Sequence, residues 1–382
     1  MGIRFLHTSD WQLGMTRAFL PAESQARYTD DQFAAIHALA RIAREQACAL
    51  VVVAGDVFDS IQPDRRIVSR AVDALADFDV PVYLLPGNHD ADSPAALWST
   101  SNIIERLPTN VTVIRDTAVL RIPGVRAEVV GAPWPSRKAE RDLVASVLES
   151  LAPPEAGIVR IAVVHGATDL LARDEADPSL ISLATLERAI SDRLITYAAL
   201  GDRHSMTSLG TSGSVWYSGA PLATDYREVA ANKALIVDVD PVTWVLTVEP
   251  VEVGTWQFVT QTFNIDGLQG VATVESYLQT LLNKERTVVK LEFVGTVNLS
   301  TYAALEDVID RSRDLFAALE ESKSHQEFVV LADGADLSDL DLSGFAHEAL
   351  VELVDAARGN EGAAEVARDS VMLLHRLAAR AS

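Results

Sequence analysis

Short apolar runs and longer amphipathic segments alternate along the first quarter of the chain. The apolar runs are five or six residues long and rich in β-branched and aromatic side chains, which is typical of buried strands. The longer segments repeat apolar residues at a period near 3.6, which predicts helices. This order of elements favours a layered α/β sheet. Strands are expected at 3–7, 50–54 and 80–85, and helices at about 29–47 and 64–78.

The middle of the chain continues with short strands and fewer helical segments. The runs at 215–218, 233–239 and 243–248 alternate or are continuously apolar, as in an antiparallel sheet. Further strands are expected at 111–114, 118–122, 127–131, 158–164 and 196–200, and a helix at 137–151.

The pattern changes near residues 250–268, which indicates a domain boundary. Beyond it, an α+β domain is predicted, and an acidic loop at 333–341 separates this domain from two terminal helices near 343–357 and 362–379. The domains expected are therefore 1–255, 256–335 and 336–382. Within the second domain, strands are predicted at 256–264, 287–295 and 326–331, and helices at 269–283 and 299–320.

Composition and charge narrow the class of protein. The chain has 382 residues, 48% of them hydrophobic, and no apolar run long enough to predict a membrane helix. Cys48 is the single cysteine, which excludes an internal disulfide and a cysteine-rich zinc site. The start of the chain is too soon polar for a secretory signal, so we expect a cytoplasmic protein without membrane contact. A net charge of −22 argues against a broadly basic nucleic-acid surface, but not against a local basic groove.

Polar side chains directly follow five of the predicted strands. Because carboxyl ends of strands gather ligands in open α/β sheets, we expect these side chains to meet. Carboxylate, amide and imidazole groups together favour Mn²⁺, Fe²⁺ or Zn²⁺ over Ca²⁺, and Asp56 could bridge two such ions, about 4 Å apart, around a phosphoryl group. Taken singly, residues 87–90 could be a turn, His165 an interior histidine and Asp202 a turn cap. The side chains concerned are Asp10, Asp56, Asn88, His89, His165, Asp202 and His204.

These motifs resemble the calcineurin-like metallophosphoesterases, and within them the SbcD-type DNA repair exonucleases. The family pattern is Asp-x-His, Gly-Asp-x-x-Asp, Gly-Asn-His-Asp, a lone His and Gly-His-x-His. In this chain the resemblance rests on residues 7–14, 55–59, 84–90 and 216–221. It implies a four-layer αββα sandwich, with residues 256–335 placed as a capping domain by position and size rather than by motif.

The resemblance also implies a role for each site residue. His89 would donate a proton to the leaving group or stabilise charge on the phosphorane. Asp59 and Asp90 would orient neighbouring groups, with Asp90 fixing the tautomer of His89. The first metal would be held by Asp10, Gln12, Asp56 and His204, and the second by Asp56, Asn88, His165 and Asp202.

Two positions depart from the family pattern. Gln12 and Asp202 stand where the family has histidine. An amide oxygen is a weaker ligand than imidazole, and Gln12 could instead be a spacer or bind a coordinated water, whereas Asp202 adds negative charge. We expect a shift toward Mn²⁺ or Mg²⁺, weaker occupancy of the first position, and activity that is reduced, redirected or lost.

Three hypotheses for the function follow. The resemblance implies Mn²⁺-dependent exonuclease activity on DNA in repair, with endonuclease action left open, by a homodimer acting with a coiled-coil SbcC-like ATPase. The alternatives are hydrolysis of a small phosphate ester, and a non-catalytic scaffold that binds DNA or the ATPase. An apolar stripe on the last helix would either pack on the body or dock on the partner's coiled coil. The stripe consists of Val366, Ser370, Leu373, Leu374 and Leu377.

Overall fold

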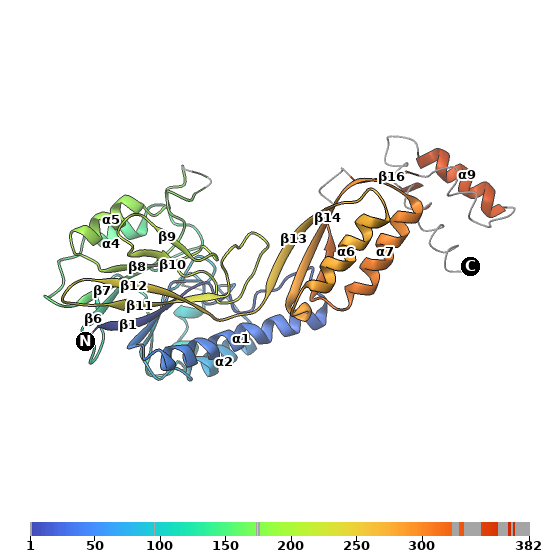
Figure 1. Cartoon of the computed structure of the whole chain (residues 1–382). Helices are drawn as coiled ribbons and strands as arrows, with labels where there is room; N and C mark the ends of the chain where they lie inside the picture. Colours follow the sequence, from blue (N-terminus) through green and yellow to red (C-terminus); the bar gives the residue numbers. More distant parts are fainter. Residues whose placement is uncertain are drawn as a thin grey trace. The chain divides into compact units, whose positions relative to one another are not determined.

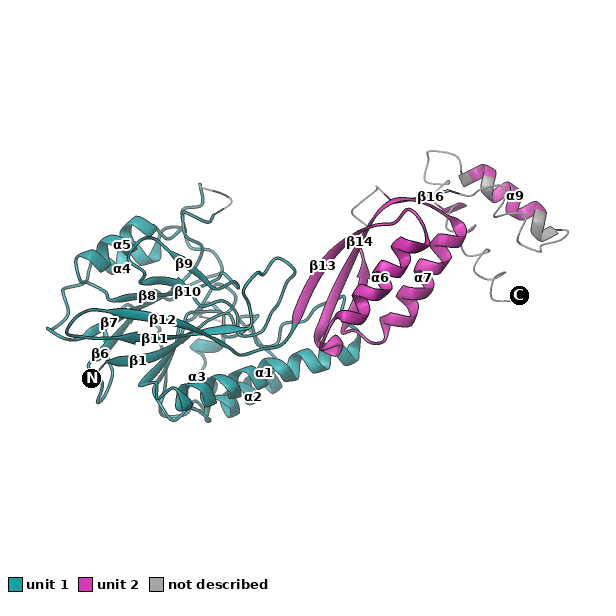
Figure 2. Ribbon diagram, in the orientation of Figure 1, with its two compact units in different colours: residues 1–256 teal, residues 257–382 magenta. Residues whose placement is uncertain are grey.

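A computed structural model shows two compact units, residues 1–256 and 257–382 (Figure 2). The boundary lies inside the predicted range of 250–268. The separation of residues 336–382 from the α+β domain stays a prediction. The residues that the structure describes are 2–94, 96–172, 174, 176–322, 328–331, 345–357, 366–367 and 370.

The 1–256 unit contains two six-stranded mixed sheets (Figure 1). In the first sheet, four strands run parallel and two antiparallel strands complete one edge. Its order is β12 (Leu246–Glu252), β11 (Lys233–Val239), β1 (Ile3–Thr8), β2 (Leu50–Val53), β3 (Val82–Leu84) and β4 (Val111–Val113). The second sheet has the order β5 (Leu120–Arg121), β6 (Ala127–Gly131), β7 (Val159–His165), β8 (Tyr197–Gly201), β10 (Val215–Tyr217) and β9 (Thr207–Leu209).

Helices cover the outer face of each sheet, and this confirms the predicted four-layer sandwich. Apolar side chains of α1 (Ala22–Glu45) and α2 (Arg65–Leu75) share a core with the first sheet. Those of α4 (Leu143–Leu148) and α5 (Leu183–Ser191) do the same with the second sheet. A third core lies between the sheets. It includes Phe5, Val52, Val163 and Tyr197, all buried.

The 257–382 unit is built around parallel strands. Its strands are β13 (Gln257–Asn264), β14 (Thr287–Asn298), β15 (Ala318–Glu321) and β16 (Phe328–Leu331), and the other three all pair in parallel with β14. The helices α6 (Leu268–Thr280) and α7 (Leu299–Arg313) lie side by side and share a core with the sheet (Figure 1). The expected α+β arrangement is therefore corrected to strands and helices that alternate around a parallel sheet. This unit also contains η2 (Lys284–Arg286) and α9 (Phe345–Ala357).

Several predicted bounds are wrong, for identifiable reasons. The first helix begins at Ala22 rather than near residue 29, because its first two turns carry few apolar side chains. The helix predicted over 299–320 ends at Arg313. Four consecutive buried residues follow at 316–319, a strand pattern that leads into β15.

Strand pairing in the middle of the chain is also corrected. β10 pairs in parallel with β8, whereas an antiparallel arrangement with the later strands was expected. β11 and β12 belong to the other sheet. The helix predicted over 137–151 is shortened to Leu143–Leu148, and the strand predicted over 243–248 moves to Leu246–Glu252. Most of the helix predicted at 362–379, with its apolar stripe, lies outside the described residues. Elements not predicted are η1 (Leu97–Ser99), α3 (Ser101–Ile104), α5, β9, η2 and β15.

Candidate metal centre

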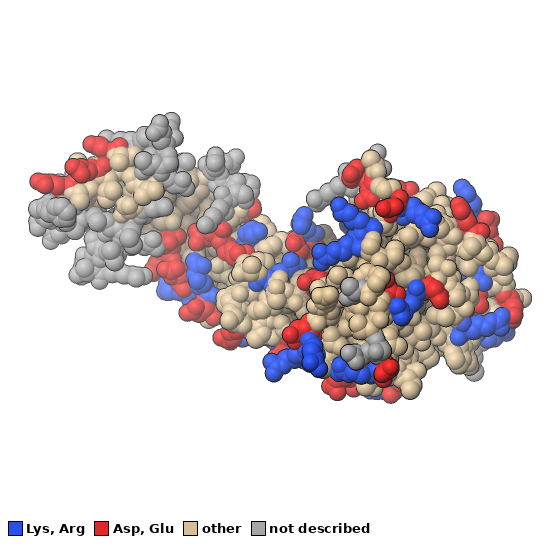
Figure 3. Space-filling model, turned by 180° about the vertical axis from the view of Figure 1, so that it is seen from behind, with Lys and Arg blue, Asp and Glu red and all other residues tan. Residues whose placement is uncertain are grey.

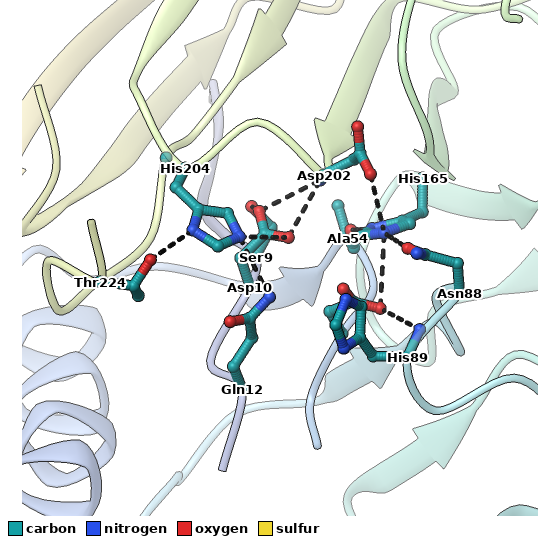
Figure 4. Close-up of polar contacts among 12 residues, drawn as sticks. Ser9, Asp10, Gln12, Ala54, Asn88, His89, His165, Asp202, His204 and Thr224 are labelled. Atoms are coloured by element: carbon teal, nitrogen blue, oxygen red, sulfur yellow. Dashed lines mark hydrogen bonds and ion pairs between the residues drawn. The ribbon is translucent and has the colours of Figure 1, made fainter. Parts of the chain in front are cut away.

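The polar residues predicted to meet do lie together, at the carboxyl ends of strands from both sheets (Figure 4). Three segments come from the first sheet: Asp10 follows β1, Asp56 follows β2, and Asn88 follows β3. His165 is the last residue of β7, and Asp202 directly follows β8. Because both sheets end their parallel strands at the same place, segments far apart in sequence supply one polar site.

One group of donors surrounds His165. Its Nε2 lies 2.8 Å from Asn88 Oδ1, 3.4 Å from Asp56 Oδ1 and 3.9 Å from Asp202 Oδ1. The other ring nitrogen, Nδ1, lies 2.9 Å from the Ala54 carbonyl oxygen and donates to it, which leaves Nε2 to face the three side-chain oxygens. These are the four residues that the resemblance assigns to the second metal.

A second group surrounds His204. Its Nε2 lies 3.0 Å from Gln12 Nε2 and 3.9 Å from Asp10 Oδ1. The two groups are joined by the backbone N–H of Asp202, which donates to Asp10 Oδ1 at 3.0 Å. Burial lowers the pKa of His204, but its hydrogen bond to Glu228 and the charge of Asp10 outweigh burial and raise that pKa to about 9. A proton, a cation and the Gln12 amide thus compete for the same nitrogen.

The donor set fits divalent cations. Three donor atoms lie within 4.8 Å of one another, one each from Asp10, Asp56 and His165. All three residues are buried. Burial raises the pKa of Asp10 and of Asp202, because no positive charge offsets their desolvation fully. The Oε1 of Gln12 is buried and has no hydrogen-bond partner within the described part of the chain. A cation would meet the needs of all these groups.

The backbone is unusual at four of these positions. Asp10, Gln12, Asp56 and Asp202 have φ angles of +54°, +44°, +53° and +98°. Non-glycine residues rarely adopt positive φ, and such strain clusters at functional sites. Gly87 permits a close approach to the site: a Cβ there would lie 2.1 Å from Asp56 Oδ1. Backbone geometry therefore aims these side chains into the site.

His89 stands beside the donors and is half-exposed. Its backbone N–H donates to Asp56 Oδ1 at 3.0 Å, and its Nδ1 lies 3.5 Å from Asp59 Oδ1. The hydrogen bond with Asp59, with help from the charge of Asp56, raises the pKa of His89 to about 9, although burial opposes this. At neutral pH the imidazole is protonated.

Asp90 does not have the predicted relationship to His89. Its Oδ1 accepts from the backbone N–H of Gly87 at 2.7 Å, and its Oδ2 accepts from that of Phe58 at 3.2 Å. Both oxygens therefore join the two motif loops, and Asp59 is the carboxylate at the His89 ring. The expectation that Asp90 fixes the tautomer of His89 is wrong, because the backbone donors of these loops need its carboxylate.

Comparison with known proteins agrees with this geometry. Residues 3–181 match the family model described as calcineurin-like phosphoesterase. The chain therefore contains a calcineurin-like phosphoesterase domain. This confirms the superfamily that the motifs predicted.

The phosphoesterase domain also has curated relatives. The SbcD subunit of the nuclease SbcCD from Rhodobacter capsulatus is 26% identical over 271 residues, and its namesake from Escherichia coli K12 is 27% identical over 263 residues. These matches cover 59% and 60% of this chain, and 64% and 63% of the relatives, so they span less than two thirds of each relative's length. Among solved structures, TT1561 of Thermus thermophilus aligns with 66% of this chain and 100% of that chain, at a TM-score of 0.42 and 12% identity.

Two residues that support His204 were not predicted from the sequence. Glu228 Oε1 lies 2.9 Å and Thr224 Oγ1 2.7 Å from His204 Nδ1. A carboxylate behind a ligand histidine fixes its tautomer and raises its basicity. Both residues lie in the loop between β10 and β11, where no strand end or spacing marks them. Their only signal is that they follow the 216–221 motif.

A cleft of about 350 Å³ opens beside the His204 group. Asp202, His204 and Glu228 line it together with arginine side chains from three loops. Within the described residues, no helix is long and apolar enough to span a membrane.

Proposed function

We propose that this protein is a metal-dependent phosphodiesterase that cleaves DNA from its ends. The observation that carries the proposal is the pair of donor groups, around His165 and around His204, with Asp56 and Asp10 between them and a protonated His89 alongside. Mn²⁺ suits this mixture of carboxylate, amide and imidazole. Two cations in the site would clamp a phosphoryl group and activate water.

The side chains supply the remaining steps. The His89 imidazolium, held by Asp59, is placed to donate its proton to the leaving oxygen. Asp90 keeps the loops that carry Asp56 and His89 in register through its two backbone hydrogen bonds. We assign Asp10, Gln12, Asp56 and His204 to the first metal, and Asp56, Asn88, His165 and Asp202 to the second.

The biological setting is proposed by analogy with the relatives. Their shared name, which describes one subunit of the nuclease SbcCD, supports a nuclease that works as part of a complex. We extend this to DNA repair in the cytoplasm, a homodimer and a coiled-coil SbcC-like ATPase as the partner. In the same proposal the 256–335 region caps the site and so favours a polymer substrate, with endonuclease action left open.

The decisive experiment assays the purified chain with Mn²⁺ on end-labelled duplex DNA and on bis-p-nitrophenyl phosphate. His89→Ala is compared with His37→Ala, because His37 is an exposed histidine that pairs with Asp77 on the helix layer. We expect both substrates to be cleaved, with activity lost in His89→Ala and kept in His37→Ala. Cleavage of the small ester alone would mean that the substrate is a small phosphate ester and not DNA.

A second function has one specific observation in its favour. The hydrogen bond between Gln12 and His204 occupies the ring nitrogen that the first metal needs. If neither substrate is cleaved at any Mn²⁺ concentration, the domain is a scaffold, and DNA binding without cleavage is then the function to measure.

A further inference from the structure

Three arginines line the cleft beside the His204 group. Arg17 lies in the loop between β1 and α1, Arg203 between β8 and β9, and Arg227 between β10 and β11. The same cleft is lined by Asp202 and His204, so it is continuous with the proposed metal centre. Three segments far apart in the sequence thus place guanidinium groups around one hollow.

The acidic groups of the cleft already have partners. Glu228 lies within hydrogen-bond distance of His204 Nδ1 and of the Thr224 hydroxyl and backbone N–H. Asp225 pairs with Arg227 at 3.3 Å. Asp202 faces His165 at 3.9 Å. Each carboxylate of the cleft therefore contacts a histidine of the proposed metal centre or, in the case of Asp225, Arg227.

Two of the arginines have side-chain N–H donors that can still bind an acceptor. Arg203 donates its Nε to Thr207, and neither it nor Arg17 forms an ion pair with any residue that the structure describes. The Nε of Arg17 is buried and has no hydrogen-bond partner there, although the charge of Arg17 lies close enough to Asp225 to lower the pKa of that carboxyl. A buried N–H without a partner costs free energy, so this geometry favours an incoming acceptor.

We propose that Arg17 and Arg203 bind the phosphate next to the scissile one on the substrate strand. The inference rests on the proposed hydrolase function and deepens it, because it makes a strand with two consecutive phosphates the preferred substrate. Guanidinium groups suit phosphate through paired N–H donors. The volume, about 350 Å³, lies at the lower end of ligand pockets and suits a single nucleotide unit. Ala167 and Leu171 give the lining an apolar part for a sugar or base.

A local phosphate site also explains how an acidic protein could hold a nucleic acid. The net charge is −22, and residues 265–382 carry 21 acidic but only 10 basic side chains. Figure 3 shows Lys and Arg side chains gathered in groups on one face of the 1–256 unit, so that face is not uniformly acidic. Local arginines at short range outweigh the distant charge, which salt screens beyond about 10 Å.

The test uses substrates that differ by one phosphate. The p-nitrophenyl ester of thymidine 5′-monophosphate is compared with the 5′-p-nitrophenyl ester of thymidine 3′,5′-bisphosphate. In a second pair, the p-nitrophenyl ester of thymidine 3′-monophosphate is compared with the 3′-p-nitrophenyl ester of thymidine 3′,5′-bisphosphate. In Arg17→Gln/Arg203→Gln we expect kcat/KM to fall 10- to 100-fold on at least one two-phosphate ester, and less than threefold on its one-phosphate counterpart. Arg65→Gln, which changes an exposed arginine at the start of α2, should alter neither.

Two outcomes would overturn the subsite. One is an equal fall on both members of each pair; the other is no fall on either two-phosphate ester. Calorimetric binding of thymidine 3′,5′-bisphosphate separates the subsite from the chemistry. If the natural chain hydrolyses no ester but binds this nucleotide, and the double variant binds it at least tenfold more weakly, the subsite stands and the hydrolase fails. Binding equal in both proteins removes the subsite.

Discussion

Gln12 Nε2 lies 3.0 Å from His204 Nε2, the ring nitrogen that would face the first cation. An amide nitrogen only donates, so this bond forms when His204 Nε2 carries no proton and Nδ1 keeps its proton, toward Glu228. Because the pKa of His204 is raised to about 9, a proton competes with the Gln12 amide for Nε2. A cation entering the first position must therefore break this contact, and the Gln12 amide must turn its oxygen inward. At His165 the contacts differ, because its Nε2 faces side-chain oxygens that can themselves bind a cation, rather than an amide nitrogen.

This asymmetry predicts unequal metal binding. Calorimetric titration with Mn²⁺ should resolve a tight site and a weaker one, separated by about tenfold or more in Kd, which corresponds to about 1.4 kcal/mol. Gln12→His should tighten the weak site without changing the strong one. Asp202→His, which alters the other group, serves as the matched comparison and should change the strong site. Two sites of equal affinity in the natural chain would contradict the interpretation.

Support of His204 by Glu228 gives a second prediction. Glu228→Gln keeps the size of the side chain but removes the negative charge 2.9 Å from His204 Nδ1. Loss of a carboxylate behind a ligand histidine lowers metal affinity or activity about 10- to 100-fold, and we expect that range for the Mn²⁺ Kd of the weaker site. Glu252→Gln is the control, since Glu252 pairs with Lys233 on the surface. Equal affinities in the two variants would assign Glu228 a structural role only.

The sequence predicted the centre of this site better than its surroundings. Asp56 and His165 could be found because each directly follows, or ends, a fully buried strand, and strand ends converge in a layered sheet. Glu228 and Arg17 could not, because the positions of loop residues depend on how distant segments pack. The role of Asp90 could not be predicted even though Asp90 belongs to a motif. Its neighbour His89 suggested a contact with the histidine ring, whereas the carboxylate accepts from the buried backbone N–H of Gly87.

Helix and strand bounds failed where local pattern and tertiary packing disagree. The exposed start of α1 has no apolar period to mark it, although Pro21 precedes the first residue of the helix. The pairing of β10 with β8 could not be predicted, because the sequence of a three-residue strand does not indicate which sheet the strand joins. Burial on both faces removes the alternation that distinguishes parallel from antiparallel pairing.

The relationship between His89 and Asp59 predicts a pH dependence. The raised pKa of about 9 means that His89 carries its proton below that pH, so a general acid there is active at neutral pH and lost as pH rises through 9. Asp59→Asn removes the main cause of the shift. The alkaline limb of the kcat/KM profile on bis-p-nitrophenyl phosphate should therefore move to lower pH, toward the ordinary value near 6.5.

Asp77→Asn is the control for this pH shift, because Asp77 contacts the exposed His37 at 2.7 Å. It should leave the limb in place. A limb that stays near pH 9 in Asp59→Asn would mean that another group sets it. An NMR titration of the His89 ring would then identify whether its pKa moved at all.

Close packing of Gly87 against Asp56 gives the last prediction. A Cβ at residue 87 would lie 2.1 Å from Asp56 Oδ1 and 2.5 Å from its backbone nitrogen, so Gly87→Ala must displace the carboxylate proposed to bridge the metals. Overpacking of this kind costs about 1–3 kcal/mol of stability, and Mn²⁺ affinity should fall with it. Gly267→Ala is the control, since nothing lies within 4 Å of a Cβ there. Thermal unfolding with and without Mn²⁺ measures both effects: Gly87→Ala should lower the Tm and reduce the Mn²⁺-dependent increase, and an unchanged increase would show that Asp56 does not hold the cation.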